Sequence, residues 1–180
     1  MLNKDNTALL VIDVQGRLAE VMHDKERLFA NVDRIIRGAK VLNLPIIWTE
    51  QVPEKLGATT PAIAELLRDV AQPITKSSFS CCGVTSFNQQ LAATGRRQIL
   101  VAGIEAHVCV YQTALDLLER GYHVELVTDA VASRSADNRL LGIERIKEAG
   151  ATLTSTEMAL FELLRAAEGP QFKEITKIVK

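Results

Sequence analysis

Short apolar runs alternate with amphipathic segments along the whole 180-residue chain. Runs such as ALLVI at residues 8–12 and QILVAG at 98–103 lack the polar alternation of a strand with one solvated face. They therefore predict strands covered on both faces. The segments between them repeat apolar residues every three or four positions, which is typical of helices. This alternation predicts a single α/β domain over residues 1–180, a doubly wound, three-layer α/β/α fold with a roughly six-stranded parallel sheet.

Periodicity and capping residues give the approximate bounds of the other elements. Further strands are expected at residues 45–50, 73–76, 122–131 and 151–155. Helices are expected at residues 24–43, 61–70, 85–94, 106–120, 137–149 and 157–167, with one more short helix after 170. The stretch at 51–61 contains two prolines and a glycine, which is typical of a loop.

Composition and charge narrow the class of protein. Hydrophobic residues make up 47% and charged residues 24%, which is ordinary for a soluble globular domain. The formal net charge of −1 gives no reason to expect nucleic acid or a membrane surface as a partner. No apolar run approaches the ~18 residues needed to span a bilayer, and no signal-peptide pattern opens the chain. We expect a cytoplasmic protein that acts on a small molecule.

Cysteine and histidine are too few and too scattered for a disulfide framework or a zinc site. The three cysteines are Cys81, Cys82 and Cys109, and neighbouring cysteines rarely bridge without strain. The three histidines form no metal-ligand spacing with them. We therefore expect no metal and no cofactor, and we expect Cys81 and Cys82 to be packing residues.

Reactive side chains follow three of the predicted strands. Asp13 follows ALLVI, Lys76 follows PIT, and Cys109 comes shortly after QILVAG. Open parallel sheets bind ligands at the carboxyl ends of their strands, so these residues are expected at one edge. Each alone also has an ordinary explanation, as a capping carboxylate, a solvated lysine or an inert buried thiol. Together they suggest a nucleophile with a base and a cation, and the helix start around Cys109 predicts a depressed thiol pKa.

The segments VIDVQ, KSSFS and GIEAHVCV, in this order, resemble the isochorismatase-like hydrolases. This cysteine hydrolase superfamily includes nicotinamidases and N-carbamoylsarcosine amidohydrolases, and the resemblance covers nearly the whole chain. It assigns the family's catalytic triad to Asp13, Lys76 and Cys109. It also implies a cis peptide bond between Ile104 and Glu105, with the N–H groups of Glu105 and Cys109 as an oxyanion hole. The variant GIEAHVCV looks like the subgroup named for an isochorismatase domain.

The chain departs from the family pattern at two informative places. Metal-binding relatives carry an Asp-x-His pattern after the second strand, whereas WTEQVPEKLGATTP contains no histidine. Many members have Thr three positions before the cysteine, where this chain has Ala106. Isochorismatases proper cleave a vinyl ether and need no cysteine nucleophile, so Cys109 favours the amidase-type branch.

The resemblance therefore implies a metal-independent cysteine hydrolase that cleaves a small amide, ureide or related C–N bond through a thioester. Three alternatives stay open: a non-catalytic or regulatory binding module on the same fold, a vinyl-ether hydrolase, and a flavodoxin-like nucleotide binder. The last lacks a phosphate-binding glycine motif in the first strand–helix connection. Relatives usually form dimers or larger assemblies, so a homodimer or larger homo-oligomer is expected.

Several further residues are expected near the same edge as walls of a substrate pocket. Packing is an equal expectation for Trp48 and Tyr111, and Gln15 is expected to bind local backbone rather than substrate. The candidates are Gln15, Trp48, Gln51, Phe79, His107 and Tyr111.

Overall fold

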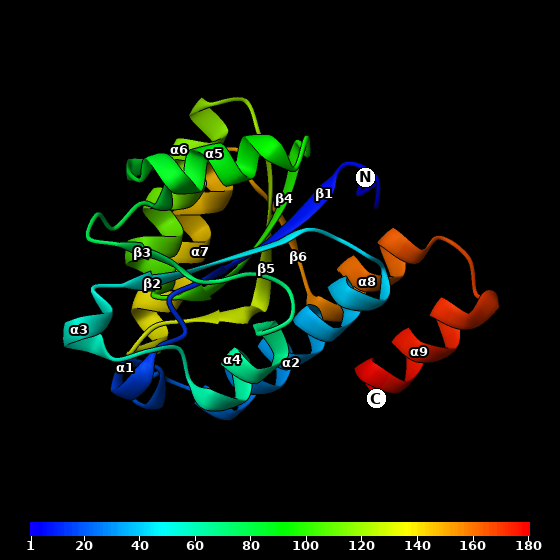
Figure 1. Cartoon of the computed structure of the whole chain (residues 1–180), viewed down its shortest axis with the longest axis horizontal. Helices are drawn as coiled ribbons and strands as arrows, with labels where there is room; N and C mark the ends of the chain where they lie inside the picture. Colours follow the sequence, from blue (N-terminus) through cyan, green and yellow to red (C-terminus); the bar gives the residue numbers. More distant parts are fainter.

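The computed structural model describes residues 1–180 and contains one sheet of six parallel strands (Figure 1). The strand order is β3-β2-β1-β4-β5-β6, so the order reverses between β1 and β4. The α/β fold predicted from the alternating pattern is confirmed. The strands are β1 (Thr7–Ile12), β2 (Ile46–Gln51), β3 (Ile74–Lys76), β4 (Gln98–Ile104), β5 (His123–Ala132) and β6 (Thr152–Thr154).

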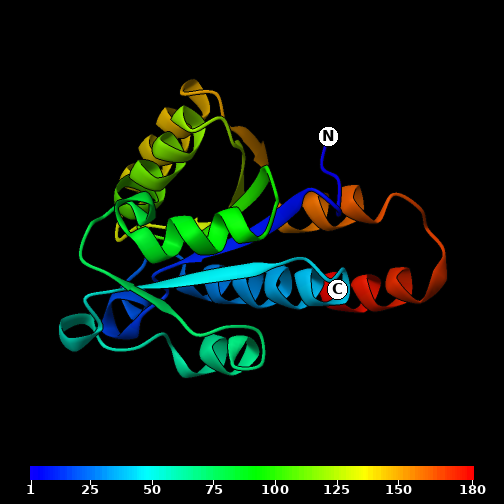
Figure 2. The same cartoon turned by 45° about the horizontal axis from the view of Figure 1, so that its top comes forward.

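Helices cover both faces of the sheet (Figure 2). One layer contains α2 (Lys25–Val41), α4 (Pro61–Leu67), α8 (Thr156–Leu164) and α9 (Gly169–Val179). The other contains α5 (Thr85–Ala93), α6 (Tyr111–Glu119) and α7 (Ala136–Glu148). None of the helices combines the length and the apolar character that crossing a membrane would require.

The apolar runs are continuous because the residues of a strand alternate between two cores. In β1, Leu9 and Val11 belong to the core beneath α2, whereas Ala8, Leu10 and Ile12 belong to the core beneath α5 and α6. Full burial of a large aliphatic side chain contributes roughly 1.5–3 kcal/mol, so both faces favour an apolar residue at every position. Because helices cover both faces of the sheet, polar functional side chains are expected at the ends of the strands.

Four short elements were not predicted from the sequence. They are α1 (Gly16–Glu20), α3 (Pro53–Leu56), the 3₁₀ helix η1 (Cys81–Gly83) and the π-helix η2 (Ala106–Val110). The expected loop at 51–61 therefore contains a helical turn, and the expected single helix at 106–120 begins as a π-helix before α6. Elements of three to five residues are too short to show a hydrophobic period, which explains why the pattern missed them.

A close contact between β1 and β4 brings two strand exits together. The register pairs Ile12 with Gly103. Gly103 has a φ of 117°, and a Cβ at this position would lie 2.0 Å from the Ile12 carbonyl oxygen, so glycine is required. Asp13 and Ile104 therefore leave the sheet beside each other, and the next peptide bond, between Ile104 and Glu105, is cis.

Candidate active site

Asp13 turns the chain away from the sheet at the end of β1. Its φ is 51°, a left-handed conformation that Asp tolerates better than most residues. The Asp13 N–H donates to the Thr49 carbonyl (3.2 Å), and the Thr49 hydroxyl donates to Oδ1 of Asp13 (2.7 Å). The residue is only 2% exposed. Thr49, which sequence reasoning missed, therefore fixes one oxygen of a buried carboxylate.

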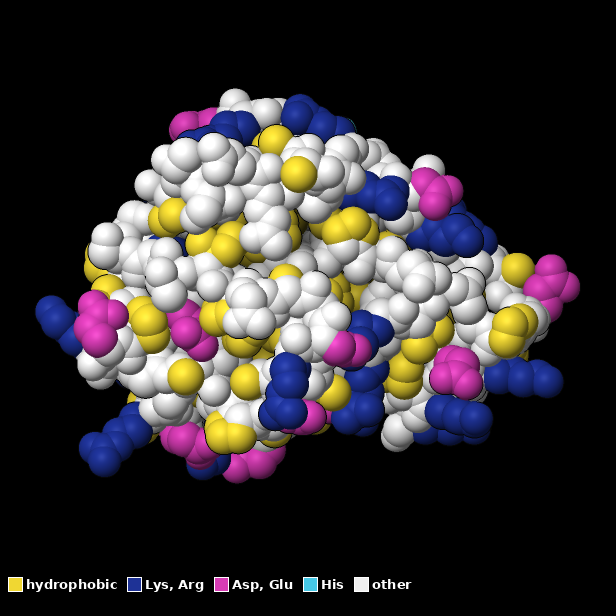
Figure 3. All heavy atoms as spheres, viewed as in Figure 1, with side chains coloured by type: hydrophobic (Ala, Val, Ile, Leu, Met, Phe, Trp, Pro, Cys, Tyr) yellow, Lys and Arg dark blue, Asp and Glu magenta, His cyan; other side chains and the backbone are white.

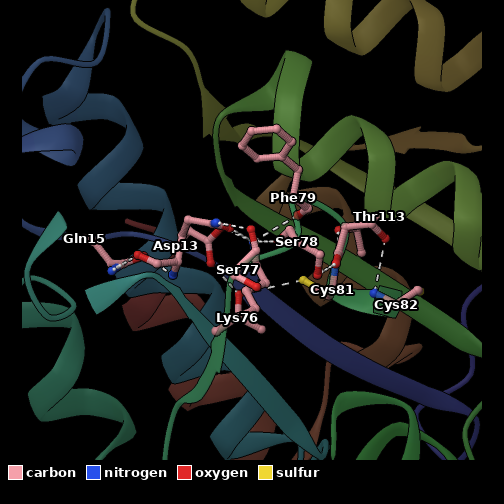
Figure 4. Close-up of polar contacts among 12 residues, drawn as sticks. Asp13, Gln15, Lys76, Ser77, Ser78, Phe79, Cys81, Cys82 and Thr113 are labelled. Carbon is pink, nitrogen blue, oxygen red and sulfur yellow. Dashed lines mark hydrogen bonds and ion pairs between the residues drawn. The ribbon is translucent and has the colours of Figure 1, made fainter. Parts of the chain in front are cut away.

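Lys76, the last residue of β3, brings a buried cation to this carboxylate. Its Nζ lies 2.7 Å from Oδ2 of Asp13 and donates to Gln51 Oε1 (2.6 Å) and to the carbonyls of Ser78 (3.2 Å) and Phe79 (3.0 Å) (Figure 4). The contact between Lys76 and Asp13 is a buried ion pair. Oδ2 of Asp13 is buried and lies beside this ammonium.

Cys109 lies in η2, and its thiol interacts with both charges of this pair. Burial is the main cause that raises the pKa of the Cys109 thiol to about 12. The charge of Asp13 and a hydrogen bond to its carboxylate act in the same direction, whereas the Lys76 ammonium lowers the pKa. The expectation of a depressed thiol pKa was therefore wrong, because desolvation outweighs the nearby cation and the helix start. The resting site holds an ion pair and a neutral thiol.

Glu105, between β4 and η2, leaves one backbone donor unused. Its carbonyl accepts the N–H groups of Val108 (3.0 Å) and Val110 (3.2 Å), which wraps the turn around this residue. Glu105 lies outside the helices and strands, and its N–H donates no backbone hydrogen bond. An unpaired N–H four positions before a thiol is a donor that could stabilise a developing negative charge.

The side chains of this turn reach the loop that follows β5. Oε2 of Glu105 accepts from the backbone N–H of Arg134 (3.0 Å) and from its Nε (3.2 Å). Nδ1 of His107 lies 3.0 Å from the Ser133 hydroxyl. Sequence reasoning missed Ser133 and Arg134, although their position after β5 at the same edge of the sheet was a usable signal.

Two of the six expected pocket residues have amides that are occupied within the protein. The Gln15 amide donates to the carbonyls of Gly57 (2.7 Å) and Gln51 (3.1 Å) and accepts from the Gln51 N–H (2.6 Å). The Gln51 amide binds Lys76 on one side and donates to the Ser77 carbonyl (2.8 Å) on the other. Gln15 thus binds backbone, as expected, and Gln51 supports the lysine.

Trp48 does not reach this edge. It lies within β2, packs in the core beneath α2, and donates its Nε1–H to the Ala71 carbonyl (3.1 Å). Alternation along β2 places Trp48 and Thr49 on opposite faces, and Thr49 is the one that contacts Asp13. Of the two equal expectations for Trp48, the structure therefore supports packing rather than a pocket wall.

The side chains of the remaining three candidates make no hydrogen bond or ion pair with Asp13 or Lys76. Phe79 is 53% exposed as a residue, and its ring points away from Lys76, although its carbonyl binds that residue (Figure 4). Tyr111 is half-buried, accepts a hydrogen bond from Arg145 (3.2 Å) and packs beneath that guanidinium. Phe79, His107 and Tyr111 stay predictions as pocket walls.

Helix α6 holds the loop that surrounds Lys76. The Thr113 hydroxyl accepts from the Cys81 N–H (3.0 Å), and Oδ2 of Asp116 accepts from the Ser80 hydroxyl (2.6 Å). Thr113 and Asp116 are three positions apart and so share one face of the helix. The segment that carries the thiol is thus tied to the loop that supplies carbonyls to the lysine.

The chain contains no group of three or more His, Cys, Asp or Glu side chains that could hold a metal ion. A cavity of about 370 Å³ lies at the opposite end of the strands, where its walls include Lys4 and Arg165.

The comparisons with known proteins identify similar sequences and similar folds. A sequence model of the Isochorismatase domain matches residues 7–158. Zebrafish (Danio rerio) isochorismatase domain-containing protein 2 is 38% identical over 179 residues, covering 99% of this chain and 89% of that protein. A solved structure described as MAR1 ribonuclease from Caenorhabditis elegans has 38% identity and a TM-score of 0.91, covering 99% of this chain and 91% of that one.

A third relative is more distant in sequence. The Escherichia coli YcaC gene product, described as an octameric hydrolase of unknown specificity, is 27% identical with a TM-score of 0.92, covering 98% of this chain and 88% of that one.

Proposed function

This chain belongs to the isochorismatase family, which has a hydrolase-type fold, and from that premise we propose that it is a cysteine hydrolase. It cleaves a small amide, ureide or related C–N bond through a thioester, without a metal. One observation carries the proposal. The buried Asp13 carboxylate and Lys76 ammonium lie 2.7 Å apart, and both influence the pKa of the Cys109 thiol. The group lies where the strand order of the sheet reverses, between β1 and β4. Ligands of open α/β sheets bind at this position.

The proposed first step combines proton transfer with attack. The neutral thiol of Cys109 gives its proton to Oδ2 of Asp13 as the sulfur bonds to the carbonyl carbon. The backbone N–H groups of Glu105 and Cys109 hold the resulting oxyanion. Loss of one such donor typically costs about 10²–10³ in rate. Because the thiol is protonated at rest, a base within reach is required, and the Asp13 carboxylate, to which the thiol hydrogen-bonds, supplies it.

The second half returns the site to its starting state. The tetrahedral species collapses, the C–N bond breaks, and the leaving amine takes the proton from Asp13. Water then attacks the thioester and gives a proton to Asp13, which passes it to the departing sulfur. Lys76 stays protonated throughout, and its charge stabilises first the thiolate character of the sulfur and then the carboxylate.

A nucleic-acid substrate has less support. The nematode relative is described as a ribonuclease. In this chain the formal net charge is −1, and basic and acidic side chains are interspersed on the face that Figure 3 shows. Binding of a phosphate backbone relies on an excess of Lys and Arg. Incubation with RNA is nevertheless a direct test, and cleavage lost in Cys109→Ala would contradict the C–N assignment.

The experiment is a panel of small amides and ureides with released ammonia or amine as the readout. We expect the wild-type protein to hydrolyse at least one member, Cys109→Ala to lose turnover, and EDTA to have no effect. Cys82→Ala is the matched control, since it removes another buried thiol, whose pKa responds to Arg120 and Asp116 rather than to Asp13 and Lys76. Turnover retained in Cys109→Ala would exclude this nucleophile, and an inert wild-type protein would favour the binding module.

The octameric relative supports a homo-oligomer for this chain. We also propose that the substrate is a small molecule and that the protein is cytoplasmic.

A further inference from the structure

The carboxylate of Glu105 is buried and points toward protein rather than solvent. The side chain is 9% exposed, and Oε2 accepts two hydrogen bonds, from the backbone N–H and the Nε of Arg134. A carboxylate this far from water must be paired or hydrogen-bonded, so the Glu105 side chain is held in one direction.

The loop that binds this carboxylate is itself anchored. Ser133 is fully buried, its carbonyl accepts the His23 N–H (2.9 Å), and its hydroxyl meets His107. From the other side, α7 packs against the same turn, because a Cβ on Gly142 would lie 2.7 Å from the Ala106 carbonyl. The turn from Glu105 to Cys109 is therefore fixed by a rigid frame on more than one side.

We propose that the Glu105 side chain is a positioning group, and this inference rests on the function proposed above. By binding Arg134 it fixes its own backbone, and so directs its unpaired N–H toward the oxyanion formed at Cys109. Arg134 has a second effect. A bare carboxylate on this turn would repel the developing negative charge, and the guanidinium neutralises it.

Two reactions of the same sulfur separate positioning from general reactivity. With p-nitrophenyl acetate, the S–C bond forms, p-nitrophenolate leaves with the C–O electron pair, and the thiol proton passes to Asp13. This acylation passes through a tetrahedral oxyanion. With iodoacetamide, the thiol proton again passes to Asp13 and the S–C bond forms as iodide leaves, but no oxyanion develops. The ratio of acylation rate to alkylation rate at Cys109 therefore reports on the oxyanion donors alone.

The expected result is a graded fall in this ratio. Glu105→Ala should lower it by about 10- to 100-fold, since a displacement of about 1 Å can cost 10² in rate. Glu105→Gln keeps an acceptor oxygen and should lose less. Arg134→Ala keeps the backbone N–H that donates at 3.0 Å, and should also lose less than Glu105→Ala. Asp33→Asn, which breaks an exposed ion pair on α2, is the matched control for lost charge.

Each other outcome has one meaning. A Glu105→Ala protein that melts cooperatively and keeps the wild-type ratio overturns the inference, as does an equal fall in both rates, which would show a merely structural role. A wild-type protein that is alkylated but never acylated at Cys109 would instead overturn the proposed function, and the inference with it.

Discussion

Two carboxylate–cation pairs lie at the carboxyl edge of the sheet, and they differ in their access to water. In Asp13–Lys76 both side chains are 2% exposed or less. In Glu105–Arg134 the carboxylate is 9% exposed but the guanidinium is 62% exposed. Burying two charges usually gives no net stability over an apolar pair. The Asp13–Lys76 pair is therefore best explained by a catalytic role. The Glu105–Arg134 pair is best explained by fixing a backbone turn, because its exposed guanidinium loses little hydration.

The largest difference between the pairs should come from removing each cation. Lys76→Met leaves Asp13 charged and buried, which should cost about 3–5 kcal/mol of unfolding free energy. It should also lower acylation by more than about 10²-fold. Arg134→Met leaves a carboxylate that still accepts a backbone N–H, and should cost less than about 1 kcal/mol. Urea unfolding of both variants measures this, and equal losses would remove the distinction.

Thr49 offers a finer test of the buried pair. Thr49→Val deletes the hydroxyl that donates to Oδ1 of Asp13 while keeping the shape of the side chain. An unsatisfied buried acceptor costs about 1–3 kcal/mol, and acylation should fall with it. Thr49→Ser keeps the donor and should retain most of the stability and activity. If Ser loses as much as Val, the contact with Asp13 is not what matters.

The fold could be predicted because it follows from local patterns. Continuous apolar runs indicate strands that are buried on both faces, and amphipathic spacing indicates the helices between them. The π-helix could not be predicted in this way. It wraps the segment around the Glu105 carbonyl and is packed against α7, and neither feature leaves a period in the sequence.

The site was only partly accessible to sequence reasoning. The strand-exit rule brought Asp13 and Lys76 together, because parallel strands end at one edge. The thiol pKa was misjudged since burial is set by distant segments, and the local helix start gives no measure of it. Arg134 escaped notice for a similar reason, because its bond to Glu105 joins residues 29 positions apart.

Alkaline pH should destabilise the region around the buried Asp13–Lys76 pair. Burial raises the pKa of Cys109 and Cys81 to about 12, and both thiols are affected by the charges of Asp13 and Lys76. The folded state thus holds these protons more tightly than the unfolded chain. The resulting stabilisation is complete below the ordinary thiol pKa of about 8.5 and is lost as pH rises toward 12.

The check is the slope of unfolding free energy against pH. Cys81→Ala should flatten the decline between pH 9 and 10 by about 1 kcal/mol relative to wild type. The stability that Cys81→Ala loses with the missing side chain is the same at every pH, so it does not affect the slope. Parallel curves for the two proteins would mean that the Cys81 thiol does not titrate with folding.

Salt should produce the smallest effect, and only on the exposed pair. Raising KCl shortens the screening length from about 10 Å at 0.1 M to about 3 Å at 1 M. Acylation by the wild-type protein should fall by less than about 2-fold as Glu105–Arg134 weakens. In Arg134→Ala the response should vanish. A large salt effect that persists in this variant would point to the substrate or to Asp13–Lys76 instead.

Trapping the covalent intermediate tests the central claim most directly. The wild-type protein is mixed with p-nitrophenyl acetate, quenched in acid during turnover, and mapped by peptide mass spectrometry. We predict one acetyl group, bound as a thioester to Cys109, and much slower labelling in Asp13→Asn. Continued ester hydrolysis with no acetyl group on Cys109, or with acetyl groups only on other residues, would contradict it.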